Sequence, residues 1–163
     1  FKPMRYLSVV FGAIAMLAGS NVLAQQSASS PVLACVAPDK LGCGCHIRLA
    51  GQSCANQQFQ RQPHMFTALD VGAPLLLVMA GQERTLPHVS HIGSSVKGDP
   101  PGRSSDLYES KDLRVNLRYS MAPSTCPKNK QEGCEFTDVN VEVSLTQRGQ
   151  KTWVQLGSGI CGC

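Results

Sequence analysis

The chain has 163 residues, eight cysteines and a formal net charge of +4 at pH 7, and this length predicts a single folded domain. So small a charge excludes a protein built around a strongly basic surface for nucleic acid or for an acidic membrane. The cysteines are too few to replace a hydrophobic core, so we expect them to supplement an ordinary one.

The first 24 residues have the pattern of a cleavable signal peptide. Arg5 supplies a basic start, residues 7–17 form an apolar run, and Val22 and Ala24 occupy the −3 and −1 positions of a cleavage site. The apolar run is much shorter than the ~20 residues that span a membrane. We therefore expect cleavage after Ala24, export to the bacterial periplasm or the cell exterior, and no membrane span in the mature chain.

Residues 25–34 are a polar tether rich in glutamine and serine, which predicts disorder. The Val-Leu-Ala-Cys sequence that ends at Cys35 loosely imitates a lipidation signal. The polar tether separates it from the apolar run, so we expect no lipid on Cys35. Loss of the signal removes one lysine and one arginine and lowers the formal charge from +4 to +2. Residues 35–163 then form a single β domain.

The first strand candidate begins at a Cys-Gly-Cys-His sequence, residues 43–46. Its residues alternate between two faces, with Cys43, Cys45, Ile47 and Leu49 on one and Gly44, His46 and Arg48 on the other. This pattern predicts that both sulfurs point inward beside the aliphatic side chains. Residues 51–63 are polar and predict a loop that contains Cys54.

Three further strand candidates follow. They are His64–Asp70, the continuously apolar Pro74–Ala80, and Arg84–Ile92, with a tight hairpin at Gly81-Gln82 before the last. Pro87 has no backbone N–H to donate, which favours a sheet edge for the last strand. Residues 93–106 are rich in Gly, Pro, Ser and Asp and contain no aromatic residue, so they predict a mobile loop.

The clearest alternation lies near the end of the chain, in residues 113–121 and 139–146, with a shorter strand at 151–156. Between the first two of these strands, Cys126 and Cys134 bracket a polar loop. Seven or eight short strands predict an all-β fold, either an antiparallel sandwich or a partly open barrel, stapled by disulfides.

Strand geometry restricts how the eight cysteines pair. Two residues at positions i and i+2 of a strand lie about 6.6 Å apart, whereas a disulfide needs its Cβ atoms about 3.8 Å apart. The two Cys-Gly-Cys units, Cys43/Cys45 and Cys161/Cys163, are therefore expected to face each other across two bonds. Cys126–Cys134 and Cys35–Cys54 complete the expected pairing.

A soft-metal site is the alternative interpretation of the same residues. The ligands would be Cys43, Cys45, His46, Cys161 and Cys163, and copper(I) or zinc(II) suits thiolate and imidazole ligands. Against this interpretation, zinc sites usually space their cysteines by two to four residues. A regular strand also turns His46 away from the sulfurs.

Other motifs in the sequence lack the context that their usual chemistry needs. The G-x-G-x-x-G at residues 157–162 has no following helix and fails as a dinucleotide site. His88 and His91 would point to opposite faces of a regular strand and have no third ligand. No catalytic motif is present, so we expect no enzyme and no catalytic residues. We predict a binding protein for a protein partner or envelope component, with contacts near Pro87 and the loop 126–134.

Overall fold

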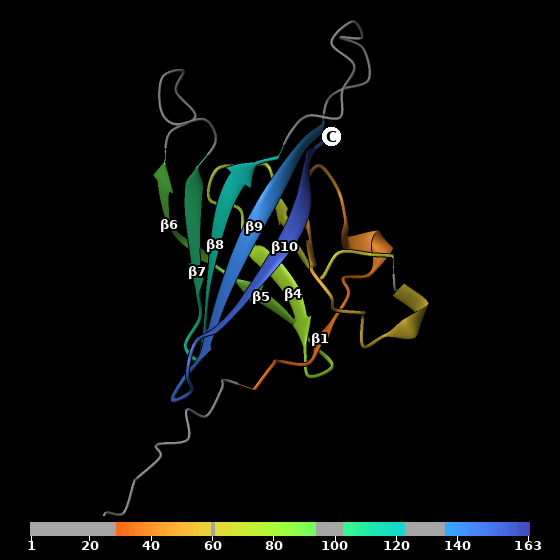
Figure 1. Ribbon diagram of the computed structural model, residues 1–163, viewed down its shortest axis with the longest axis vertical. Coiled ribbons are helices and arrows are strands. Elements are labelled where there is room, and N and C mark those ends of the chain that lie inside the picture. The colour runs from red at the N-terminus through yellow and green to blue at the C-terminus, as the bar shows by residue number, and fades with distance from the viewer. Residues whose placement is uncertain (1–28, 60, 94–102, 123–135) are drawn as a thin grey trace, which may run out of the picture.

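The computed structural model describes residues 29–59, 61–93, 103–122 and 136–163. In these residues the chain is nearly all antiparallel β-strand, arranged as one sheet that curls into an open half-barrel (Figure 1). The prediction of a disulfide-stapled, all-β fold is confirmed, and of its two forms the open barrel is the one observed. The predictions for the signal peptide, for residues 94–102 and for the loop 126–134 lie outside the described residues. The predicted disordered tether, residues 25–34, is wrong at its end, because Leu33 and Ala34 are buried and pair with a neighbouring strand.

The sheet contains ten strands. They are β1 Leu33–Ala34, β2 Gly44–Leu49, β3 Met65–Ala68, β4 Leu75–Met79, β5 Gln82–Leu86, β6 His88–Gly93, β7 Ser104–Glu109, β8 Leu113–Met121, β9 Phe136–Gln147 and β10 Trp153–Gly162. Their order across the sheet is β1-β4-β3-β2-β10-β9-β8-β7-β6, and β5 pairs with β4. Two short 3-10 turns, Pro38–Lys40 and Gln57–Phe59, lie beside the sheet, and in the described residues no helix is long and apolar enough to cross a membrane.

The hairpin between β4 and β5 turns over two residues, Ala80 and Gly81, because Met79 pairs directly with Gln82. Both turn residues have positive φ, 50° and 74°. This is the conformation of a type I′ turn, whose twist matches that of the flanking strands. The hairpin occurs close to where the sequence predicted it.

Pro87 divides one predicted strand into two. The segment predicted as Arg84–Ile92 is β5 and β6, with Pro87 between them. β5 pairs with β4 and β6 pairs with β7, so a single bent segment of chain approaches both ends of the curled sheet. Pro87 was expected at a sheet edge. This is confirmed, because it directly precedes β6, which is the last strand in the order.

β7 was not predicted, because its residues are polar and follow a glycine- and proline-rich stretch. It begins at Ser104, inside the segment expected to be a mobile loop. Its pairing with β8 runs from Ser104 to Glu109. Tertiary pairing here overrides a local composition that favours a loop.

The core fills the concave side of the curled sheet. Its members alternate along each strand and include Ile47, Leu49, Met65, Leu75, Leu77, Val115, Leu117, Val141, Val143 and Trp153. The opposite face of β7, β8 and β9 is polar and carries the exposed ion pairs Arg114–Glu109 and Arg118–Glu142. Such exposed pairs contribute little to stability, so the buried aliphatic layer determines the fold.

Candidate functional site

Two disulfides join β2 to β10, where the two Cys-Gly-Cys units lie antiparallel. Cys43 is bonded to Cys163 and Cys45 to Cys161, with Cα atoms 4.4 Å and 4.0 Å apart. We call these two bonds the clasp. In the sheet, Cys45 is the direct cross-strand partner of Cys161, and Gly44 that of Gly162.

Only one bond of the clasp faces the core. Cys161 packs against the buried cluster, and Cys45 is half-buried, but Cys43 and Cys163 are exposed. The expectation that both pairs of sulfurs point inward is therefore wrong for the outer pair. The reason is that β2 begins at Gly44, which leaves Cys43 beyond the end of the paired strand and of the core beneath it.

The residues of the alternative metal site are not arranged as a ligand set in this oxidised chain. Their four sulfurs are bonded in pairs, so none is a thiolate. His46 lies on the outer face of β2, where its Nε2 is 2.9 Å from the carbonyl oxygen of Gly42. Its ring stands edge-on to that of Phe66, with centroids 5.1 Å apart.

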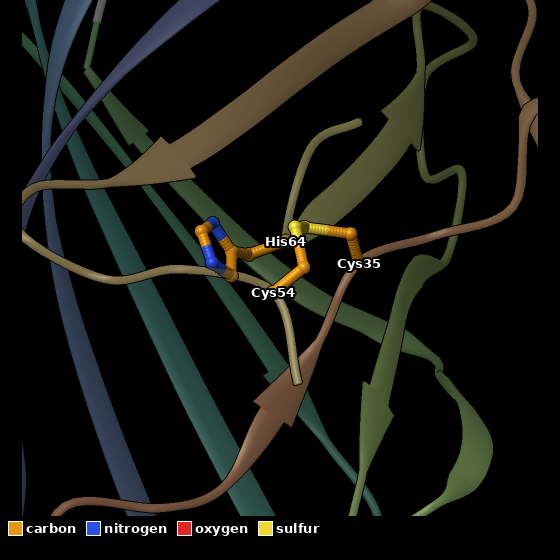
Figure 2. Close-up of side chains that lie close together, drawn as sticks. All are labelled: Cys35, Cys54 and His64. Carbon is orange, nitrogen blue, oxygen red and sulfur yellow. A yellow bond between two sulfur atoms is a disulfide. The ribbon is translucent and has the colours of Figure 1, made fainter. Parts of the chain in front are cut away.

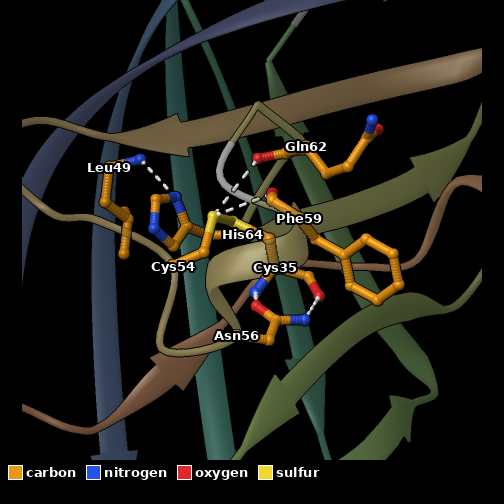
Figure 3. The surroundings of a disulfide bond; sticks show 7 residues. All are labelled: Cys35, Leu49, Cys54, Asn56, Phe59, Gln62 and His64. Atoms are coloured by element: carbon orange, nitrogen blue, oxygen red, sulfur yellow. Dashed lines mark hydrogen bonds between the residues drawn. A yellow bond between two sulfur atoms is a disulfide. The ribbon is translucent and has the colours of Figure 1, made fainter.

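A third disulfide, Cys35–Cys54, is buried beside His64 (Figure 2). One ligand atom from each of these three residues lies within 4.8 Å of the others. The side chain of Asn56 holds the backbone of Cys35 through two hydrogen bonds of 2.8 and 3.0 Å (Figure 3). The bond thus ties the chain next to β1 to the loop after β2. The predicted partners Cys126 and Cys134 lie outside the described residues.

His64 is fully buried, and its ring nitrogens have different surroundings. Nδ1 accepts a hydrogen bond of 3.1 Å from the backbone N–H of Leu49 (Figure 3). The ring proton is therefore on Nε2, which has no hydrogen-bond partner among the described residues. A metal-bound histidine normally donates its other N–H to an acceptor. Here that position is taken by a donor, so His64 does not suit a metal site with Cys35 and Cys54.

Burial lowers the pKa of His64 below 6.5, and the positive charge of Arg48 lowers it further, against an opposing interaction with the backbone of Ser53. Just below pH 6.5, His64 therefore binds a proton in the unfolded chain but remains neutral in the folded chain. We expect the free energy of unfolding to be constant above pH 6.5 with respect to this residue. As the pH falls below 6.5, the free energy of unfolding decreases by up to about 1.4 kcal/mol per pH unit, until His64 is also protonated in the folded state.

Urea unfolding of the wild type and of His64→Gln between pH 8 and pH 5 tests this effect. Glutamine keeps an acceptor for the Leu49 N–H but does not titrate, so the variant should be less pH-dependent between pH 6.5 and pH 5. His46→Gln is the matched control and should retain the wild-type slope. An equal slope in His64→Gln would show that another group is responsible.

A groove of about 490 Å³ lies on the outer face of β2, β9 and β10. Its lining includes Arg48, Arg61, Phe136, Asn140, Ser158 and Ile160. Cross-strand pairing fixes the arrangement, because Ile160 is opposite His46 on one side and Asp138 on the other. The groove therefore combines apolar side chains with two arginines and one carboxylate, that of Asp138, on the outer face of the sheet.

A separate cluster lies on the concave face at the edge of the sheet. His88 Nε2 and His91 Nδ1 approach the same oxygen, Asp106 Oδ1, at 2.8 and 2.9 Å. The prediction that the two histidines point to opposite faces is wrong. A bulge between His88 and Ser90 inserts one residue into the pairing of β6 with β7, which brings both rings to one face.

Two tyrosines, the buried Tyr108 and the partly buried Tyr119, continue this polar cluster. Tyr108 is hydrogen-bonded to Thr67 on β3 and to Tyr119 on β8, and its ring stands edge-on to that of His88, with centroids 5.3 Å apart. Burial raises the pKa of both tyrosines above 10. At neutral pH both hydroxyls are therefore protonated and act as hydrogen-bond partners.

No protein-family model, curated protein or solved structure matches the chain. The geometry of the groove and of the histidine–aspartate cluster is therefore the basis for a functional assignment.

Sequence reasoning missed both of these sites. Arg61 and Phe136 are distant in sequence and meet at the groove only through the order of β2, β10 and β9. No local sequence pattern predicts the bulge in β6 or the pairing of Asp106 with His91 either. The one available signal was the pair of histidines, His88 and His91. Their rings can point to the same face only if the strand alternation is broken between them.

Proposed function

We propose that the chain is an exported, disulfide-stabilised binding protein without a catalytic role, and that the groove holds an extended segment of a partner protein. The observation that carries this proposal is the groove itself, about 490 Å³ in volume and lined by apolar side chains, two arginines and Asp138. Binding sites are commonly concave and combine an apolar lining with a few well-placed polar groups.

The outer face of β10 supports this proposal. Three of its side chains, Val154, Leu156 and Ile160, are 54%, 63% and 48% exposed although all are apolar. They alternate along one face of the strand, with the small residue Ser158 between Leu156 and Ile160. Exposed apolar side chains gathered on one face are typical of surfaces that bind a partner.

Charge indicates which segment would fit. Arg48, Arg61 and Asp138 line the groove, so its arginines outnumber its one carboxylate. Arg61 is exposed and forms no hydrogen bond or ion pair with another residue in the described part of the chain. A carboxylate of the partner would give Arg61 a two-point hydrogen-bonded contact. The expected ligand is therefore an extended peptide with apolar side chains and at least one acidic residue.

Selection from a library of random 12-residue peptides tests the proposal. Enriched peptides should combine apolar residues with Asp or Glu, and Ile160→Asp or Arg61→Glu should each weaken their binding at least tenfold, as loss of an interface anchor does. Val89→Asp is the matched control, because Val89 is an equally exposed apolar residue on β6, away from the groove. Enrichment without acidic residues, or unchanged binding to Ile160→Asp, would contradict the proposal.

A further inference from the structure

The histidine–aspartate cluster lies on a different surface from the groove. Asp106 is paired with Leu117 of the core and shares its face, so the cluster is on the concave side of the sheet. The groove is on the outer face of β2, β9 and β10. His88 and Asp106 are mostly buried, with side chains 16% and 17% exposed, whereas His91 is 49% exposed.

The cluster brings two imidazoles and one carboxylate, all possible metal ligands, to one point. Two imidazoles donate to the same carboxylate oxygen, which uses both of its lone pairs for them. The arrangement also depends on a bulge, and bulges are found next to binding sites because they redirect side chains. The result is three ligand-type groups that converge at the edge of the sheet.

We propose that His88, His91 and Asp106 bind one divalent transition-metal cation such as Zn²⁺. The ligand atoms would be His88 Nε2, His91 Nδ1 and Asp106 Oδ1, which are the atoms that now meet through hydrogen bonds. Imidazole and carboxylate are ligands that zinc accepts, at about 2.0–2.2 Å. The cation takes the place of the shared protons.

Binding requires a contraction of the cluster. The two nitrogens stand on either side of Oδ1, so they must move toward each other to share a cation. His91 can move, because its side chain is half exposed on the last strand of the sheet. His88 is held in place by the edge-on contact with Tyr108. One ligand therefore adjusts while two remain fixed.

A fourth coordination position is open. β6 is the last strand in the order, and among the described residues its far edge has no strand paired along it. Tyr108 and Tyr119 keep their protons, so neither supplies a phenolate. Three protein ligands and one solvent ligand are the coordination typical of an accessible zinc site.

Calorimetric titration of the oxidised chain with Zn²⁺ at pH 7.5 tests the proposal. We expect one equivalent of Zn²⁺ to bind, and we expect His91→Ala and Asp106→Asn each to weaken binding at least tenfold. His46→Ala is the matched control, because it removes a histidine from the outer face, and it should bind as the wild type does. Circular dichroism shows whether each variant keeps the fold.

Nitrogen-15 spectra of the imidazole rings give a second readout that does not depend on a variant folding. Addition of Zn²⁺ should shift the ring nitrogens of His88 and His91 and leave those of His46 and His64 unchanged. No binding, or binding that moves His46 or persists unchanged in Asp106→Asn, would overturn the proposal. Ile160→Asp should bind Zn²⁺ normally, so failure of the groove and failure of this site are distinguishable.

Discussion

A chain that lacks both bonds of the clasp is expected to lose about 7 kcal/mol of unfolding free energy, whereas a chain that lacks either bond alone loses about 2 kcal/mol. The two bonds close nearly the same loop, since their cysteines are separated by 120 and 116 residues. Either bond alone lowers the entropy of the unfolded chain and so raises its free energy by about 5 kcal/mol. The other then closes only a small additional ring, worth about 2 kcal/mol.

Three variants measure this coupling by urea unfolding. Cys43→Ser with Cys163→Ser removes the exposed bond, Cys45→Ala with Cys161→Ala removes the half-buried bond, and the third variant combines all four changes. The combined loss should exceed the sum of the separate losses by about 3 kcal/mol. The combined loss would also be comparable with the whole stability of an ordinary domain, ~5–15 kcal/mol. Additive losses would show that the bonds do not act through a shared loop.

Strand alternation accounts for what the sequence could predict. Residues 113–121 and 139–146 alternate so regularly that only one face can be buried, and β8 and β9 occupy these positions. The same regularity brought the two Cys-Gly-Cys units opposite each other, because residues i and i+2 of a strand cannot bond to each other. Local geometry was sufficient in both cases.

Departures from strand alternation account for the features that the sequence could not predict. Pro87 bends one segment so that it pairs with two different strands, and the bulge after His88 reverses the faces of the residues that follow. Neither event has a local hydrophobic pattern. The groove depends on the order of strands that are distant in sequence, as does the meeting of Asp106 with two histidines. Such sites require the register of the whole sheet.

The glycine inside the first Cys-Gly-Cys unit has a steric role that the disulfide argument does not explain. Gly44 lies on the outer face of β2, opposite Ala68 of β3, while the sulfurs of its neighbours bond to β10. A Cβ atom there would meet the backbone oxygen of Thr67 at 2.3 Å and the ring of Phe66 at 2.5 Å. No real Cβ atom approaches so closely, so only glycine fits between the two cysteines.

Gly44→Ala is therefore expected to lower the free energy of unfolding by about 2–3 kcal/mol, as overpacking in a close-packed interior does. The ring of Phe66 can turn aside, but the Thr67 carbonyl belongs to the backbone and moves only if β3 shifts away from β2. Phe66→Leu in the same chain should thus recover only part of the loss. Gly42→Ala is the matched control, because a Cβ there meets nothing within 4 Å, and it should change stability by less than about 0.5 kcal/mol. Equal urea midpoints for the two alanine variants would show that β2 and β3 separate easily, and that the clasp alone holds this end of the sheet.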